Sequence, residues 1–244
     1  MESDMLRRLM VWVVLLSVSL WSASPVPARS RQMLVVVSSD WTADHGRLYR
    51  FERKGKRWYQ AGRSIAVKLG RNGLGWGRGL HGYRLDSGPV KREGDKRAPA
   101  GVFSLPYLFG EGANIFRYPY RRMTVYHRCV DDRRSRYYNR VIDSRKVRKD
   151  YRSFEKMKFP GGLYRYGIFV AHNPERIPGA GSCIFLHIQR SDGRATVGCT
   201  AMKRRDLVTV MRWLDPAKEP VLIQAPRGSI RRLLPDNFQL TQLR

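Results

Sequence analysis

The sequence is poor in acidic residues: 20 Asp and Glu stand against 47 Lys and Arg, for a formal net charge of +27. The four charges within residues 1–28 cancel, so the whole excess lies after them. Such a charge attracts polyanions, either nucleic acid or an anionic cell wall. The basic residues are spread from Arg29 to Arg244, and no helix-turn-helix, RNA-recognition or zinc-finger pattern is present. We therefore expect no specific nucleic acid and expect attraction to an anionic cell wall; a merely solvated basic surface is the alternative.

Cysteine and histidine are also scarce, at three and five residues, and no C-x-x-C or H-x-x-x-H spacing occurs. The sequence therefore predicts no metal site. In an oxidising compartment an odd number of cysteines permits one disulfide and one free thiol. If Cys199 is the free thiol, Cys129 and Cys183 form the remaining pair; the alternative is that both stay as buried thiols.

Long hydrophobic runs are absent after residue 28. Before it, a polar start containing Arg7 and Arg8 precedes an apolar run at 9–20 and small residues at 22–28. This layout predicts a signal peptide at residues 1–28 and export to the periplasm or cell envelope. An uncleaved anchor is the alternative, although the run is shorter than the roughly twenty residues that a spanning helix needs.

Most of the remaining chain consists of short strand-like segments. A buried or alternating apolar pattern predicts strands at 33–38, 47–52, 57–60, 64–69, the end of 89–103, 117–131, 164–171, 182–187 and 221–224. One segment, 203–214, places Leu207, Val210, Met211 and Leu214 on one helical face before Pro216. Many strands and one helix predict a mainly β domain over residues 33–224, followed by a peripheral tail at 225–244.

Two further segments have no strong strand or helix pattern. Residues 70–82 contain six glycines, with no Gly-Lys-Ser/Thr that would make a phosphate loop. We expect a flexible surface loop there, with Trp76 and His81 either contacting a sugar or peptide or serving no such role. Residues 131–158 are charged and aromatic, and we expect an insertion with little regular structure.

Cys199 and His187 are the most informative pair of residues. His187 ends an apolar run that predicts a buried strand, and Cys199 follows a turn at 191–194. An imidazole that takes the proton of a nearby thiol activates it as a nucleophile and lowers its pKa. Gly198 leaves the backbone beside the sulfur uncrowded, so its N–H and that of Cys199 could face an oxyanion. The alternative is a buried structural cysteine with a structural histidine.

The order of several motifs resembles the L,D-transpeptidase catalytic domain, the YkuD family. The resemblance covers residues 33–224 and is closest to a divergent branch; its motifs here are KREGD (91–95), APAGVF (98–103), CVDD (129–132), YYNR (137–140), AHNP (171–174), FLH (185–187) and GC (198–199). It implies a β-sandwich-like domain with one helix after the nucleophile turn. Better-known members carry Ser-His-Gly-Cys and an Arg two positions later, where this chain has 196–199 (TVGC) and Ala201.

The resemblance implies an acyltransferase of cell wall biogenesis. Cys199 would attack an L-to-D peptide bond in a peptidoglycan stem, His187 would move the proton, and the Gly198 and Cys199 N–H groups would stabilise the oxyanion. A second amine would then attack the thioester, with no metal or organic cofactor. For substrate binding we select His172 and Asn173 at a strand end, and Arg190 and Arg194, whose guanidinium groups could grip a stem carboxylate in place of the missing Arg.

Other interpretations stay open. His172 could be purely structural, and Asp131 or Asp132 could orient the imidazole or simply be solvated. The same nucleophile could serve an L,D-hydrolase, a carboxypeptidase or endopeptidase with water as acceptor. A non-catalytic basic protein that binds wall or nucleic acid is the third reading. The sequence does not determine the oligomeric state.

Overall fold

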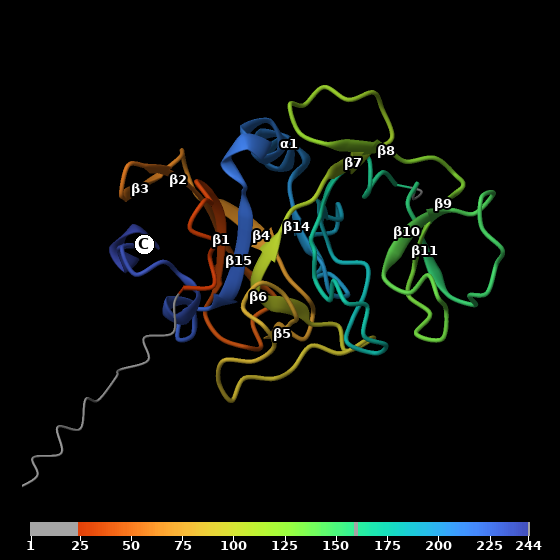
Figure 1. Ribbon diagram of the computed structural model, residues 1–244, viewed down its shortest axis with the longest axis horizontal. Helices are drawn as coiled ribbons and strands as arrows, with labels where there is room; N and C mark the ends of the chain where they lie inside the picture. Colours follow the sequence, from red (N-terminus) through yellow and green to blue (C-terminus); the bar gives the residue numbers. More distant parts are fainter. Residues whose placement is uncertain (1–23, 159–160, 244) are drawn as a thin grey trace, which may run out of the picture.

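The computed structural model describes residues 24–158 and 161–243, so most of the expected signal peptide lies outside the described residues. These residues form a large mixed sheet, a separate three-stranded sheet and, within the described ranges, a single α-helix, α1 (Arg204–Trp213). Figure 1 shows the small sheet at one end of the molecule and the C-terminal segment at the other. The mainly β fold class is therefore confirmed.

The twelve-stranded sheet has the order β5-β6-β15-β1-β2-β4-β14-β13-β12-β7-β8, with β3 paired to β2. Its strands are β1 (Gln32–Ser38), β2 (His45–Lys54), β3 (Arg57–Gln60), β4 (Ile65–Lys68), β5 (Leu74–Trp76), β6 (Ala98–Ser104), β7 (Leu108–Gly110), β8 (Tyr120–Arg122), β12 (Tyr166–Phe169), β13 (Phe185–Ile188), β14 (Thr200–Met202) and β15 (Val221–Pro226). The small sheet contains β9 (His127–Val130), β10 (Arg140–Asp143) and β11 (Phe154–Lys156), in the order β10-β9-β11.

The core is built around β1, which is parallel to β15 and antiparallel to β2. All seven of its residues are buried, as expected for a continuous apolar run with both faces covered. The helix α1 packs against β12 and β13 through Leu207, Val210 and Met211. The predicted strand at 33–38 and the predicted helix at 203–214 are thus confirmed, the helix beginning after Lys203 and ending before Leu214.

The glycine-rich segment 70–82 is a surface loop only at its two ends. Its central part is β5, a fully buried strand parallel to β6. The Trp76 indole N–H donates to Asp86, and His81 accepts a hydrogen bond from the Val102 N–H. Gly73 has φ +77° and lies so close to another backbone segment that a Cβ would meet the Trp41 carbonyl oxygen at 2.1 Å. The glycines permit close packing, and Trp76 and His81 are buried, which favours the alternative in which they contact no sugar or peptide.

Segment 131–158 has little regular structure, as expected: it contributes only the short strands β10 and β11, which pair with β9. One further expectation needs correction. Segment 225–244 is not peripheral, because its apolar residues join the main core: Ile230, Leu233, Leu234, Phe238 and Leu243. In the described ranges, no helix is long and apolar enough to cross a bilayer.

Candidate active site

The strands β13 and β14 bring His187 and Cys199 to one cavity. They are parallel neighbours in which His187 is paired with Ala201, and Cys199 lies directly before β14. Side chains alternate along a strand, so Cys199 and Ala201 project from the same face. His187, Cys199 and Ala201 all line a cavity of about 560 Å³. The thiol and the imidazole therefore line one cavity, and their catalytic pairing stays a prediction.

The wall of this cavity is largely apolar and also carries the basic side chains of Lys156, Arg190 and Arg194. Leu163, Tyr164 and Val197 contribute apolar surface, and the crossover from β13 to β14 contributes Arg190 and Arg194. Asp192 pairs with both guanidinium groups, at 3.2 Å and 2.8 Å. The two arginines selected from the sequence thus lie beside His187 and Cys199, exposed enough to meet a ligand.

Cys199 is a buried thiol held by backbone groups. The Phe185 N–H donates to its sulfur at 3.3 Å, and the thiol donates to the Cys183 carbonyl oxygen at 3.5 Å. Burial raises the pKa of Cys199, and the charge of Glu155 adds to that rise. The expected depressed pKa is therefore wrong: the apolar surroundings disfavour a resting thiolate.

His187 is also buried and neutral. Burial lowers its pKa to about 4. Its Nδ1 lies 2.8 Å from the Ile188 carbonyl oxygen, which can only accept, so Nδ1 carries the proton and Nε2 holds the free lone pair. The Tyr164 ring packs edge-on against the imidazole at 5.4 Å between centroids. Within the described ranges no hydrogen bond joins this imidazole to the Cys199 sulfur, so the resting pair is a neutral thiol beside a neutral base.

The turn before Cys199 depends on Thr196 and Gly198. Gly198 has φ +150°, a conformation that L side chains rarely adopt. Its N–H donates to the Thr196 hydroxyl at 3.2 Å, and that hydroxyl donates to the Cys199 carbonyl oxygen at 2.6 Å. The Gly198 N–H expected to face an oxyanion is thus engaged. The Cys199 N–H makes no hydrogen bond within the described part of the chain and remains as a donor.

His172 and Asn173 lie outside this cavity. His172 is buried, with Nδ1 accepting from the Arg78 N–H and Nε2 donating to the Ala180 carbonyl oxygen. Burial lowers its pKa to about 3, with the charge of Lys91 contributing. The Asn173 amide donates to the carbonyl oxygens of Ile177 and Gly181. These side chains hold the loop before β13, and a direct substrate contact finds no support in the geometry.

The acidic pair Asp131 and Asp132 does not orient the imidazole, which is held by Ile188. Asp132 accepts from the backbone N–H groups of Arg134 and Arg152, which hold its pKa below the usual range. Asp131 lines a second, smaller cavity that also reaches Cys199.

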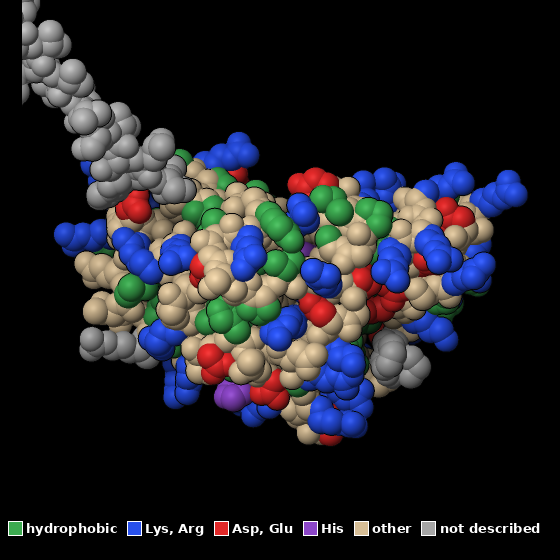
Figure 2. Space-filling view, turned by 90° about the horizontal axis from the view of Figure 1, so that it is seen from below, with side chains coloured by type: hydrophobic (Ala, Val, Ile, Leu, Met, Phe, Trp, Pro, Cys, Tyr) green, Lys and Arg blue, Asp and Glu red, His purple; other side chains and the backbone are tan. Residues whose placement is uncertain are grey.

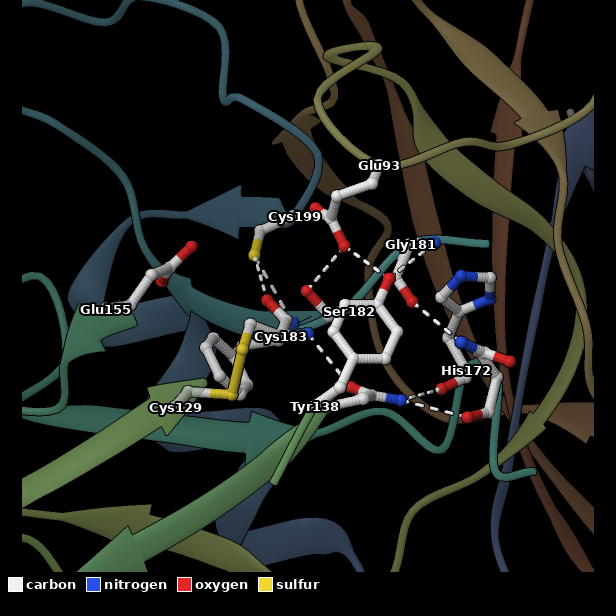
Figure 3. Close-up of a disulfide and its surroundings, with 12 residues drawn as sticks. Glu93, Cys129, Tyr138, Glu155, His172, Gly181, Ser182, Cys183 and Cys199 are labelled. Atoms are coloured by element: carbon white, nitrogen blue, oxygen red, sulfur yellow. Dashed lines mark hydrogen bonds between the residues drawn. A yellow bond between two sulfur atoms is a disulfide. The ribbon is translucent and has the colours of Figure 1, made fainter. Parts of the chain in front are cut away.

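A disulfide joins Cys129 in β9 to Cys183 just before β13, and Cys199 is the free cysteine. Figure 3 shows this bond beside the Cys199 sulfur. Of the two alternatives left open by the sequence, the disulfide is therefore the correct one. It ties the small sheet to the segment whose Cys183 carbonyl oxygen accepts from the Cys199 thiol.

Several motif residues form the framework behind this disulfide. The Asn139 amide donates to the carbonyl oxygens of His172 and Asn173, and its oxygen accepts from the Cys183 N–H. Glu93 accepts hydrogen bonds from Tyr138 and Ser182. Residues from motifs far apart in the chain thus form hydrogen bonds with the segment before β13 and hold its backbone in place.

Sequence reasoning missed Glu155 and Tyr164. The Tyr164 hydroxyl donates to Glu155 at 2.5 Å, and both residues line the cavity of Cys199. Burial raises the pKa of Glu155 to about 7. Glu155 sits between Phe154 and Lys156 in a short segment with no distinctive pattern, so only the pairing of β11 with β9 reveals its place.

Comparisons with known proteins add little. No protein-family model matches the chain, and no curated protein matches it. One solved structure, "Structure of Bdellovibrio bacteriovorus Bd1075", aligns with 12% sequence identity and a TM-score of 0.41. The alignment covers 86% of this chain and 56% of that chain.

Proposed function

We propose that this protein is an exported, cysteine-dependent peptidoglycan L,D-transpeptidase that acts on stem peptides through a thioester. The observation that carries the proposal is the placement of Cys199 and His187 on neighbouring parallel strands at one cavity. The motif resemblance supports the substrate class.

The neutral state of both groups suits general-base activation during attack. As the Cys199 sulfur bonds to the substrate carbonyl carbon, Nε2 of His187 takes the thiol proton. The Cys199 N–H stabilises the oxyanion, an interaction typically worth about 3 kcal/mol per donor. When the C–N bond breaks, His187 returns the proton to the leaving amine, which leaves a thioester on Cys199.

Arg190 and Arg194 provide a place for the substrate carboxylate. Each already forms an ion pair with the exposed Asp192, and exposed ion pairs are weak. A stem carboxylate could therefore displace Asp192 or bind beside it. The basic surface would attract the anionic wall over a longer range. Figure 2 shows Lys and Arg side chains over much of the face that it draws, with fewer acidic side chains among them.

The test is incubation of the protein with a tetrapeptide stem, followed by mass analysis of intact protein and of products. We expect an acyl adduct on Cys199 and loss of the terminal stem residue. Cys199→Ala should abolish the adduct, and His187→Ala should slow its formation at least about a hundredfold, the usual size of a general-base contribution. An unmodified Cys199 at saturating stem would contradict the proposal.

The acceptor distinguishes transfer from hydrolysis. Cross-linked or exchanged stems would establish a transpeptidase, whereas trimmed stems alone would establish an L,D-hydrolase with the same nucleophile. Wall binding without any acyl adduct would favour the non-catalytic interpretation.

A further inference from the structure

The imidazole of His187 is oriented by few contacts. Its Nδ1–H donates to the Ile188 carbonyl oxygen at 2.8 Å, and within the described ranges this is its one hydrogen bond. One hydrogen bond at one ring atom leaves the ring plane free to tilt. Its one ring neighbour in the same ranges is Tyr164, which meets it edge-on, with 5.4 Å between the centroids and 87° between the planes. Tyr164 therefore restricts the direction of Nε2, the atom that would take the thiol proton.

Tyr164 is held at both ends of its side chain. Its ring packs edge-on against Phe109 and Phe185, with 6.1 Å and 5.4 Å between centroids. Its hydroxyl donates to the Glu155 carboxyl oxygen at 2.5 Å. Burial raises the pKa of Tyr164, and the charge of Glu155 adds to that rise, so the hydroxyl keeps its proton and remains the donor. Ring packing and one hydrogen bond thus fix the ring that meets His187.

The anchor of Tyr164 belongs to the small sheet and not to the strands that carry the catalytic pair. Glu155 lies in β11, directly opposite Cys129 of β9. Cys129 forms the disulfide with Cys183, whose carbonyl oxygen accepts from the Cys199 thiol. The small sheet therefore reaches the thiol through Cys183 and the imidazole through Tyr164.

We propose that Tyr164, anchored by its hydrogen bond to Glu155, is a positioning residue for His187. The anchored ring limits the tilt of the imidazole while Nε2 takes the thiol proton. A general base must lie within about 3.2 Å of the atom whose proton it removes, so a small tilt of the ring lowers the rate. This inference rests on the proposed function, in which His187 is the general base, and deepens it by naming what aligns that base.

The proposed role needs an acceptor at position 155 and not a charge. A carboxyl group accepts a hydrogen bond through an oxygen whether it is ionised or neutral, so Glu155 can hold Tyr164 in both states. The charge of Glu155 has a separate effect, because it raises the pKa of Cys199. Variants that remove the charge but differ in the acceptor therefore distinguish positioning from electrostatics.

The test is single-turnover acylation of Cys199 by a tetrapeptide stem, followed by mass analysis of intact protein at increasing stem concentration. Tyr164→Phe keeps the ring and removes the hydroxyl. Its limiting acylation rate should fall about tenfold, because a 1 Å misplacement of a reacting group can cost about a hundredfold. The stem concentration for half-maximal rate should stay the same, because the ring that lines the cavity is retained.

Two substitutions at Glu155 separate the acceptor from the charge. Glu155→Gln and Glu155→Ala both lose the carboxylate, whereas only the glutamine variant keeps an oxygen that accepts from Tyr164. Glu155→Gln should therefore acylate much faster than Glu155→Ala, which should be slowed as much as Tyr164→Phe. The double variant Tyr164→Phe, Glu155→Ala should be no slower than either single one, because each removes the same hydrogen bond. Additive losses would contradict the proposal.

A spectroscopic measurement tests the imidazole itself, without the reaction. With isotope-labelled histidine nitrogens, the His187 signals are those that disappear in His187→Ala. The wild type should show one tautomer, with the proton on Nδ1 as the bond to Ile188 requires. In Tyr164→Phe the signals should split or average between ring orientations. Unchanged His187 signals in that variant would also contradict the proposal.

The matched control is Tyr118→Phe. Tyr118 is a buried tyrosine whose hydroxyl donates to the Leu105 carbonyl oxygen at 2.7 Å, and it lines neither cavity of Cys199. Both Phe variants lose one hydrogen bond and should lose similar stability, but only Tyr164→Phe should acylate slowly. If Tyr164→Phe acylates like Tyr118→Phe, the positioning role is wrong although the proposed function stands. If the wild type forms no acyl adduct on Cys199, the proposed function fails and the positioning role fails with it.

Discussion

Glu155 and Cys129 face each other across the β9–β11 ladder, and the disulfide of Cys129 leads directly to Cys183, whose carbonyl accepts from the Cys199 thiol. Glu155 and Cys199 are therefore linked through the strand ladder, the disulfide and a hydrogen bond. The small sheet forms one wall of the Cys199 cavity, and the disulfide is its covalent link to the segment before β13.

Removal of that bond should destabilise the protein strongly. The disulfide spans 54 residues, and the chain-entropy estimate for such a loop is about 4 kcal/mol. We expect the double variant Cys129→Ser, Cys183→Ser to lose a free energy of unfolding of that order in urea titrations. Cys199→Ser keeps the disulfide and should lose much less. Equal losses in the two variants would show that the bond contributes nothing to stability.

Alkylation should report a neutral thiol at Cys199. Without reductant, iodoacetamide should add once per native chain, at Cys199, because the other two cysteines are joined. The rate should keep rising beyond about pH 8.5, the ordinary pKa of a free cysteine, because burial raises the pKa of this one. His187→Ala should slow the reaction near neutral pH. A rate that reaches its plateau below pH 7 would instead demonstrate a resting thiolate.

Stability should fall as the solution becomes acidic, with Glu155 opposing the fall. Burial lowers the pKa of His187 to about 4 and that of His172 to about 3. Between pH 6.5 and 4 the unfolded chain therefore binds more protons than the folded one, so the free energy of unfolding falls as the pH falls. The pKa of Glu155 is raised to about 7, so its contribution is present at low pH and is lost as the pH rises through 7. In Glu155→Gln the free energy of unfolding should therefore fall more steeply as the pH is lowered, which denaturant titrations at pH 7, 6 and 5 will measure. An unchanged slope would mean that Glu155 titrates normally.

Substitution of Gly198 should harm both stability and acylation. A side chain at φ +150° is strained, at a cost of about 1–3 kcal/mol, and the turn that presents Cys199 must shift to relieve it. Gly198→Ala should lower the melting temperature and slow acyl-enzyme formation. Gly112→Ala is the control, because a Cβ there meets nothing within 4 Å. Wild-type kinetics in Gly198→Ala would contradict the role of this turn.

Salt should separate wall binding from chemistry. The screening length falls from about 10 Å at 0.1 M salt to about 3 Å at 1 M salt. The attraction of a protein of net charge +27 to an anionic cell wall should therefore weaken. The apparent KM on intact wall should rise, while kcat should change little because Cys199 and His187 are buried. A short stem peptide should show a much smaller effect. Equal salt sensitivity of the two substrates would make the basic surface incidental.

The sequence predicts this fold well where one segment carries its own pattern. The apolar run of β1 and the one-sided face of α1 are local signals, and both elements form where expected. The shared cavity of His187 and Cys199 follows from a strand, a turn and a second strand that are close together in the chain.

The remaining features depend on contacts between distant segments. The glycines of 70–82 indicate flexibility when read alone, yet Gly73 is needed for close packing against Trp41. The pKa of Cys199 depends on burial by the small sheet and on the charge of Glu155, neither of which the local motif contains. The hydrogen bond from the Gly198 N–H to the Thr196 hydroxyl depends on the rotamer of Thr196, which cannot be predicted from the spacing of the motif.

The crossover from β13 to β14 has ends fixed by strand pairing and a middle that lines the cavity. Its ends are anchored by the pairing of His187 with Ala201, whereas its middle supplies Arg190, Arg194 and Val197 to the cavity wall. Loops of this kind tolerate changes of length at little entropic cost. Variation within it could therefore change the cavity wall, and with it the ligands that fit, while Cys199 and His187 keep their places. Grafting crossovers of different length and charge between residues 189 and 196 is a direct route to altered selectivity.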